Sequence, residues 1–262
     1  MRRTTPSVIL LVLVSGVTFS IGDASRQAHV KRHQRYGSSK AVLRRQRPYK
    51  VQHSKPVTQA LLVTNVVIFV SLFNRHNLFR ALAKDNMKVR SGQTHRMLTS
   101  CFLHGSIPHL YLNMNSLHSL GSAAEPWFGS TRLACIYVTS GLAGNMLSLS
   151  LNTAPLSVGA SGCIFGLLGA HMAFLYLNAD FFAARGWHVS RSMRSLIDAC
   201  VLTAAIGIMP GSRIDNVGHL GGLVSGAVCG FLAGPRLMQT KHGFVIDAPI
   251  INHAQMRGRH AT

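Results

Sequence analysis

A long tract without charge is the strongest constraint on how this chain can fold. From Leu133 to Ala184, the only Asp, Glu, Lys or Arg residue is Asp180. Across the whole chain 13% of residues are charged, whereas soluble globular domains have about 25%. A tract this long with almost no charge is typical of a polytopic membrane protein. We therefore expect an all-α membrane protein whose apolar segments cross the bilayer as helices.

Apolar runs of helical length predict six membrane-spanning helices. The second run is weak by hydropathy because it holds several His and Asn residues, but it has no Lys or Arg, and polar groups in a membrane helix usually face the bundle interior. Six runs of roughly 20 residues fit the thickness of a bilayer. They define a membrane domain at 57–236, followed by a polar, basic tail at 237–262. The expected spans are Val57–Phe73, Pro108–Glu125, Leu133–Leu151, Ala154–Ala179, Ser195–Pro210 and Asn216–Pro235.

The first 56 residues have the composition of a targeting extension. Residues 1–24 form a signal-like segment or signal anchor, with two arginines followed by the apolar run Val8–Val14. Residues 25–56 are basic and contain no acid, which is typical of a disordered transit segment. Together they match the two-part presequence of proteins that enter plastids surrounded by extra membranes. We expect an organelle membrane, with a plastid favoured and a mitochondrial or secretory-pathway membrane as alternatives. A seventh span followed by a basic arm is the other reading of this segment.

The net charge of +20 does not indicate nucleic-acid binding. Ten of the 27 Lys and Arg residues fall between Arg26 and Lys55, and no basic stripe is interleaved with aromatic residues. The five cysteines stand singly, without a CxxC pair, and so form a poor disulfide or zinc framework. The sequence therefore predicts no nucleic-acid partner, no metal and no cofactor, and the lipid bilayer as the surroundings of the folded part.

Three polar sites stand out against the apolar background. His109 and Asn113 are spaced i, i+4 and share one helix face. Ser161 lies in a Gly-Ala-Ser-Gly stretch and His219 in a Gly-His-Leu-Gly-Gly stretch. Each site lies near the start of the second, fourth or sixth span, and these spans run in the same direction. All three can therefore meet at one depth below one membrane surface.

Glycines allow the fourth and sixth spans to approach closely. Gly222 and Gly226 follow His219 at +3 and +7, and Gly162 and Gly166 have GxxxG spacing. Such small-residue faces let helix backbones pack closely in lipid. Only close packing brings a short serine side chain within hydrogen-bond reach of an imidazole on another helix.

Four ordered motifs resemble the rhomboid family in sequence and spacing, over a match from about Val57 to Gly234. The resemblance implies a six-transmembrane-helix bundle that acts as an intramembrane serine endopeptidase. Such an enzyme hydrolyses peptide bonds in or near the transmembrane segments of membrane-protein substrates. The motifs are Phe102-Leu103-His104-Gly105 with His109-Leu110-Tyr111-Leu112-Asn113, Gly141-Leu142-Ala143-Gly144-Asn145, Gly159-Ala160-Ser161-Gly162 and Gly218-His219-Leu220-Gly221-Gly222.

The resemblance assigns a role to each polar residue. It implies that Ser161 is the nucleophile, that His219 is its general base, and that His109 and Asn113 donate to the oxyanion. It also places Phe165 under the imidazole, where many relatives have Tyr. These roles agree with the chemistry, since a neutral imidazole can take the serine proton and return it to the leaving amine.

The sequence offers no clear third member for a catalytic triad. Asp198 and Asp215 are the only candidate acids to orient His219, and neither matches a position of the family, so a dyad is expected. A catalytically inactive rhomboid-like protein that binds membrane clients or serves quality control is the alternative function. Retention of Ser161 and His219 argues against it. A transporter would show internal inverted repeats, and none is seen.

Overall fold

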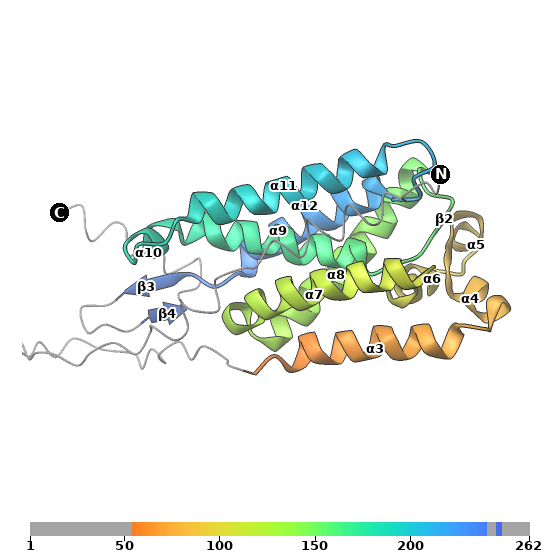
Figure 1. Ribbon diagram of the computed structural model, residues 1–262, viewed down its shortest axis with the longest axis horizontal. Coiled ribbons are helices and arrows are strands. Elements are labelled where there is room, and N and C mark those ends of the chain that lie inside the picture. Colours follow the sequence, from red (N-terminus) through yellow and green to blue (C-terminus); the bar gives the residue numbers. More distant parts are fainter. Residues whose placement is uncertain (1–53, 240–244, 248–262) are drawn as a thin grey trace, which may run out of the picture.

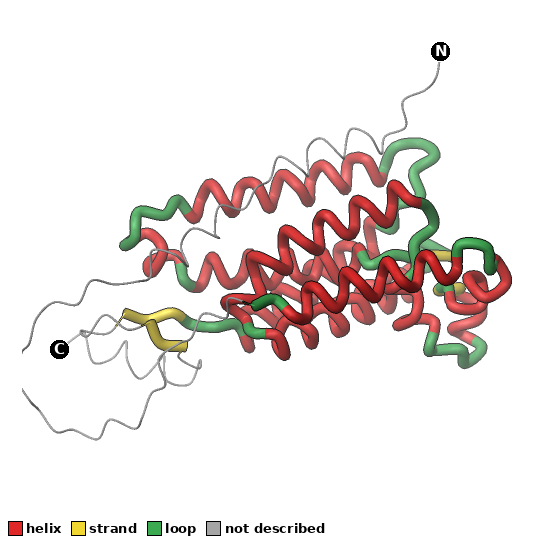
Figure 2. Tube along the Cα trace, turned by 60° about the horizontal axis from the view of Figure 1, so that its bottom comes forward, coloured by secondary structure: helices red, strands yellow, loops and turns green. Residues whose placement is uncertain are grey.

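The computed structural model describes residues 54–239 and 245–247, and its regular structure is mostly helical. The long helices lie side by side in an elongated bundle (Figures 1 and 2). The expected signal-like segment and nearly all of the basic segment lie outside the described residues, so the targeting hypothesis stays a prediction. The helices of 17 to 22 residues are α3 (Pro56–Leu72), α7 (Ile107–Phe128), α8 (Ser130–Leu151), α9 (Ser161–Leu177), α11 (Val189–Gly207) and α12 (Asn216–Ala233).

Shorter elements fill the connections, and some of them are strands that the all-α expectation did not include. Two-residue strands β1 and β2 pair antiparallel, and β3 pairs antiparallel with β4. Strands this short depend on tertiary pairing and leave no periodic signal in the sequence. The short elements are α4 (His76–Leu82), β1 (Lys84–Asp85), α5 (Asn86–Arg90), α6 (Arg96–Thr99), the 3₁₀ turn η2 (Ser100–Phe102), β2 (Leu156–Ser157), α10 (Ala179–Ala183), β3 (Leu237–Gln239) and β4 (Val245–Asp247).

The helix bounds differ most from the expected spans at the starts of α9 and α11. Helix α9 begins at Ser161, not at Ala154, because the segment before it forms β2 and passes through Gly159 at φ +135°. Helix α11 begins at Val189, earlier than the expected Ser195. Its first turns carry polar and basic residues, which hydropathy does not recognise as helix.

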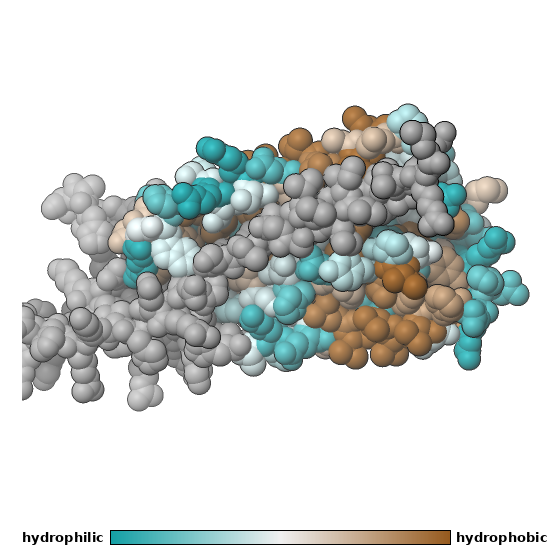
Figure 3. All heavy atoms as spheres, in the orientation of Figure 1, coloured by the Kyte–Doolittle hydropathy of each residue, from teal (hydrophilic) through white to brown (hydrophobic). Residues whose placement is uncertain are grey.

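Length and apolar composition single out two helices in the described part as able to cross a membrane. These are α8 and α12, while α3 and α9 are apolar but shorter. Large apolar side chains such as Val67, Val70 and Val228 are exposed on α3 and α12. Figure 3 shows apolar surface over α3 and over α11, with hydrophilic surface toward both ends of the bundle. Apolar exposure of this extent marks a surface that contacts lipid or a partner.

Three helices begin at the same end of the bundle. In Figure 1, α7, α9 and α12 all start at the end where α4, α5, α6 and β2 lie. At the opposite end, the Glu125 carboxylate accepts hydrogen bonds from the backbone N–H groups of Val57 and Thr58 at 3.0 and 2.9 Å, and from the Ser130 hydroxyl at 2.7 Å. This buried carboxylate ties the start of α3 to the corner between α7 and α8.

Candidate active site

The candidate nucleophile is the first residue of α9. Ser161 is half-buried and follows Gly159, whose N–H donates to the Ser100 carbonyl at 3.0 Å. The positive φ of Gly159 suits glycine. A Cβ there would lie 2.9 Å from His109 Nε2 and 3.7 Å from Ser161 Oγ. The His109 ring and the Ser161 hydroxyl therefore both lie where a side chain at position 159 would project.

The candidate base lies over the turn of α9 that carries the serine. His219 is in the first turn of α12 and is 8% exposed. Its ring stacks on Phe165, with 4.3 Å between ring centroids and 8° between planes. Ser161 and Phe165 are spaced i, i+4 and share one face of α9. The stacking thus brings the imidazole to the face that bears the serine hydroxyl.

Neither candidate acid takes the third position of a triad. Asp198 is exposed on α11. Asp215 instead caps α12, where its Oδ1 accepts from the Gly218 N–H at 2.9 Å. Among the described residues, His219 Nδ1 has no hydrogen-bond partner. The geometry contains a serine and a histidine without an acid that orients the imidazole.

The two expected oxyanion donors lie on the first turns of α7. The N–H of His109 donates to the Ser106 hydroxyl at 3.3 Å, which caps the helix, and the His104 ring packs edge-on against the His109 ring at 5.2 Å. Asn113 is buried, and its Nδ2 donates to the His109 carbonyl at 2.9 Å. An amide carries two N–H donors, so one of them is not committed to this intrahelical bond.

Glycines bring the backbones of α9 and α12 into direct contact. A Cβ at Gly222 would overlap the Gly162 carbonyl oxygen, and a Cβ at Gly226 would overlap that of Gly166. On the α9 side, a Cβ at Gly166 would collide with the Ser140 side chain of α8, whereas one at Gly162 would meet only ordinary contacts near 3.7 Å. A Cβ at Gly169 of α9 would also overlap the Leu223 carbonyl oxygen of α12, so glycines on both helices are required at this interface.

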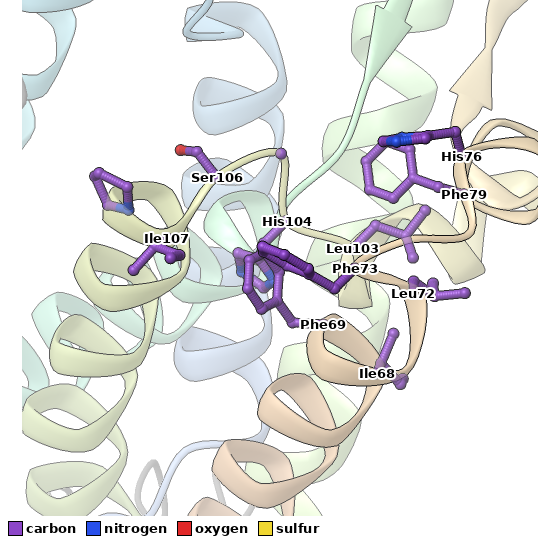
Figure 4. A pocket seen from close by; sticks show the side chains of 12 residues that line it. Ile68, Phe69, Leu72, Phe73, His76, Phe79, Leu103, His104, Ser106 and Ile107 are labelled. Carbon is purple, nitrogen blue, oxygen red and sulfur yellow. The ribbon is translucent and has the colours of Figure 1, made fainter.

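A cavity of about 370 Å³ opens beside the site, between the end of α3 and the loop that leads into α7. Figure 4 shows Phe69, Phe73 and His104 gathered there, with Ile107 on the α7 side. His104 lines this largely apolar cavity, and its ring also packs against the His109 ring. The cavity is large enough for apolar side chains of a bound chain.

The match to known proteins covers the candidate site residues from Ser100 to Gly226. The family model of the Rhomboid domain matches residues 91–236, more than half of the chain. The chain belongs to the rhomboid family. Membership makes it a membrane protein.

Rhomboid relatives in plants and bacteria align with the same region. RHOMBOID-like protein 1 of Arabidopsis thaliana is 36% identical over 61% of this chain and 39% of its own length. RHOMBOID-like protein 6, mitochondrial, of the same plant is 34% identical over 60% of this chain and 48% of its own length. Rhomboid protease GluP of Bacillus subtilis is 32% identical over 67% of this chain and 34% of its own length. The chain thus spans less than half the length of each of these rhomboid relatives.

Sequence reasoning did not predict the structural roles of the residues that support the candidate site. Asn145 Nδ2 donates to the Met97 carbonyl of α6 at 2.6 Å and to the Ser100 hydroxyl of η2 at 3.1 Å, and so holds both elements against α8. Lys84 and Ser148 lie beside the cap of α12 formed by Asp215. Asp215 is considered only as a candidate acid in the sequence analysis, although an Asp just before a helix is an N-cap signal that could have predicted its capping role. A buried lysine leaves no such signal.

Proposed function

We propose that this rhomboid protein is an intramembrane serine endopeptidase that hydrolyses peptide bonds in or near the transmembrane segments of membrane-protein substrates. The stacking of His219 on Phe165, over the α9 turn that begins with Ser161, is the observation that carries the proposal. In this mechanism, the neutral imidazole takes the proton of Ser161 as its oxygen attacks the scissile carbonyl. It then returns the proton to the leaving amine.

The charge that develops on the carbonyl oxygen needs donors already in place. We assign this role to the side chains of His109 and Asn113 and to the backbone N–H of Ser161. The His109 ring lies where a side chain at position 159 would project, near the Ser161 hydroxyl, and this position supports the assignment. The N–H of Ser161 is at a helix start, where N–H groups have no intrahelical acceptor.

The same proposal includes six membrane spans. They are the six long helices: α7 buries its polar Asn113 and Glu125 in the bundle, and the basic residues of α11, Arg191 and Arg194, lie in its first turns. The expected partners are the lipid bilayer and transmembrane protein substrates.

We propose an organelle membrane as the location, with a plastid favoured. One relative is named as mitochondrial, so imaging of a C-terminal tag should be compared with markers for both organelles.

The decisive experiment is cleavage in liposomes. The purified full chain should cut a generic transmembrane substrate, and Ser161→Ala and His219→Ala should each abolish cleavage because the two residues act as one unit. A fluorophosphonate probe, which reports an activated serine, should label the wild type and neither variant. A well-folded wild type that neither cleaves nor takes the probe would favour the inactive, client-binding alternative. Turnover by either variant would reject the dyad.

A further inference from the structure

A lysine is completely buried at the end of the bundle that carries the candidate site. Lys84 belongs to β1, its side chain is 0% exposed, and its Nζ donates to the Ser148 hydroxyl at 2.8 Å and to the Ala154 carbonyl at 3.2 Å. Its Nζ also lies 4.0 Å from Asp215 Oδ2. Burial lowers the pKa of Lys84 from its usual value, and the Asp215 carboxylate opposes part of that effect. A buried cation is costly unless it is paired and hydrogen-bonded, so this side chain depends on its three partners.

The carboxylate beside this lysine holds the helix that carries His219. Asp215 Oδ2 accepts a hydrogen bond from the Ser148 hydroxyl, and Oδ1 accepts from the Gly218 N–H at 2.9 Å. The Asp215 carbonyl accepts from the His219 N–H at 2.9 Å. Asp215 therefore fixes the first turn of α12 through both its side chain and its backbone.

The same lysine contacts the segment that leads to Ser161. Lys84 is paired with Ser157 in the β1–β2 ladder, and β2 leads through Gly159 into α9. The Asn86 N–H donates to the Pro155 carbonyl at 2.9 Å, which reinforces this pairing. In Figure 1, β2 and the start of α12 lie at the same end of the bundle. One buried ammonium group thus links the approach to the serine with the cap of the histidine helix.

We propose that Lys84, acting through Ser148 and Asp215, is a positioning residue that sets the place of the His219 imidazole relative to Ser161. The inference rests on the proposed function. Without the ammonium group, the Asp215 carboxylate loses its nearby cation and the Ala154 carbonyl loses its donor. The first turn of α12 and the segment before α9 then shift independently, although no residue that touches the substrate has changed.

The test uses Lys84→Met, which keeps most of the side-chain volume and removes the charge. The full chain is reconstituted in liposomes and assayed well below the Tm of each variant, so that the folded fractions are equal. We expect kcat to fall on the order of 10²-fold, the loss associated with a misplacement of about 1 Å, with KM nearly unchanged and fluorophosphonate labelling slowed in parallel. Lys88→Met, the same change at an exposed lysine of the same segment, should leave kcat and labelling at wild-type values.

A second variant separates positioning from simple loss of structure. Asp215→Asn keeps a capping oxygen for the Gly218 N–H, and combined with Lys84→Met it leaves a neutral cluster. The double variant should have a higher kcat than Lys84→Met alone, because no carboxylate is left without its cation. If Lys84→Met does not fold, Asp215→Asn alone should still lower kcat and slow labelling at unchanged KM.

Wild-type kcat in a folded Lys84→Met protein, or a change confined to KM, would overturn the positioning role. Independent effects of Lys84→Met and Asp215→Asn on kcat would also overturn it. An unreactive wild type would instead reject the proposed protease function, so the two failures are distinguishable.

Discussion

Helices α9 and α11 are similar in length but are held in the protein very differently. Of the 17 residues of α9, ten are buried, whereas α11 buries only Leu196 among its 19. Helix α9 packs its backbone against α12 through glycines, while the end of α11 is attached by a side chain, with Asn216 Nδ2 donating to the Ala204 carbonyl at 3.0 Å. The candidate serine and histidine both lie on the α9–α12 pair.

This contrast in packing indicates where the fold can tolerate movement. A serine and an imidazole on separate helices must keep their separation to within a fraction of an ångström, and direct backbone contact gives that rigidity. A helix with one buried residue has little packing to lose when it shifts. We therefore expect substitutions at the α9–α12 contact to stop the chemistry and those at the α11 contact to change it little.

The largest effect is expected from Gly222→Val. The new side chain would overlap the Gly162 carbonyl, a backbone atom that cannot rotate away. Overpacking of this kind costs about 1–3 kcal/mol of unfolding free energy, and it would push α12 away from α9. Cleavage in liposomes should become undetectable, with the Tm lowered.

The matched control is Val224→Phe, which enlarges an exposed residue two positions further along the same helix. Its cleavage rate and Tm should stay close to the wild-type values. Equal losses at the two positions would show that α12 is as sensitive to substitution on its exposed face as on the face toward α9. The account of a glycine-specific contact would then be wrong.

The next largest effect is expected from removing an oxyanion donor, a change that leaves the α9–α12 contact intact. Asn113→Ala and His109→Ala should each lower kcat by roughly 10²–10³-fold, the usual loss for one oxyanion donor. KM should change little, because these groups act on charge that exists only in the transition state. A rise in KM at constant kcat would mean that they bind the substrate itself.

Much of the candidate site could be predicted because its residues are polar in an apolar chain. The sequence predicts that His109, Asn113, Ser161 and His219 lie on three spans with a common direction. Each lies near the start of α7, α9 or α12, and these helices start at the same end of the bundle. Their catalytic roles remain predictions. The glycine spacing likewise indicated which faces of two helices could meet.

The supporting residues could not be found in this way. Lys84 lies in a connection with no periodic pattern, and its partners Ser148 and Asp215 are distant in sequence. Its burial depends on the β1–β2 pairing, which is a tertiary feature. Hydropathy also misplaced the start of α11, because polar residues in its first turns obscure a helix that the backbone forms readily.

The smallest effect is expected at the α11 contact. Asn216→Ala removes the hydrogen bond to the Ala204 carbonyl, and a single such bond contributes about 0.5–1.5 kcal/mol to stability. The Tm should therefore fall slightly, while kcat should change far less than with either oxyanion variant because the α9–α12 contact is intact. Ala205→Val adds bulk at an exposed position of α11, as Gly222→Val does at the α9–α12 contact, and it should be neutral. A loss of activity from Asn216→Ala as large as that from Gly222→Val would mean that α11 is part of the rigid frame, and the contrast between the two helices would fail.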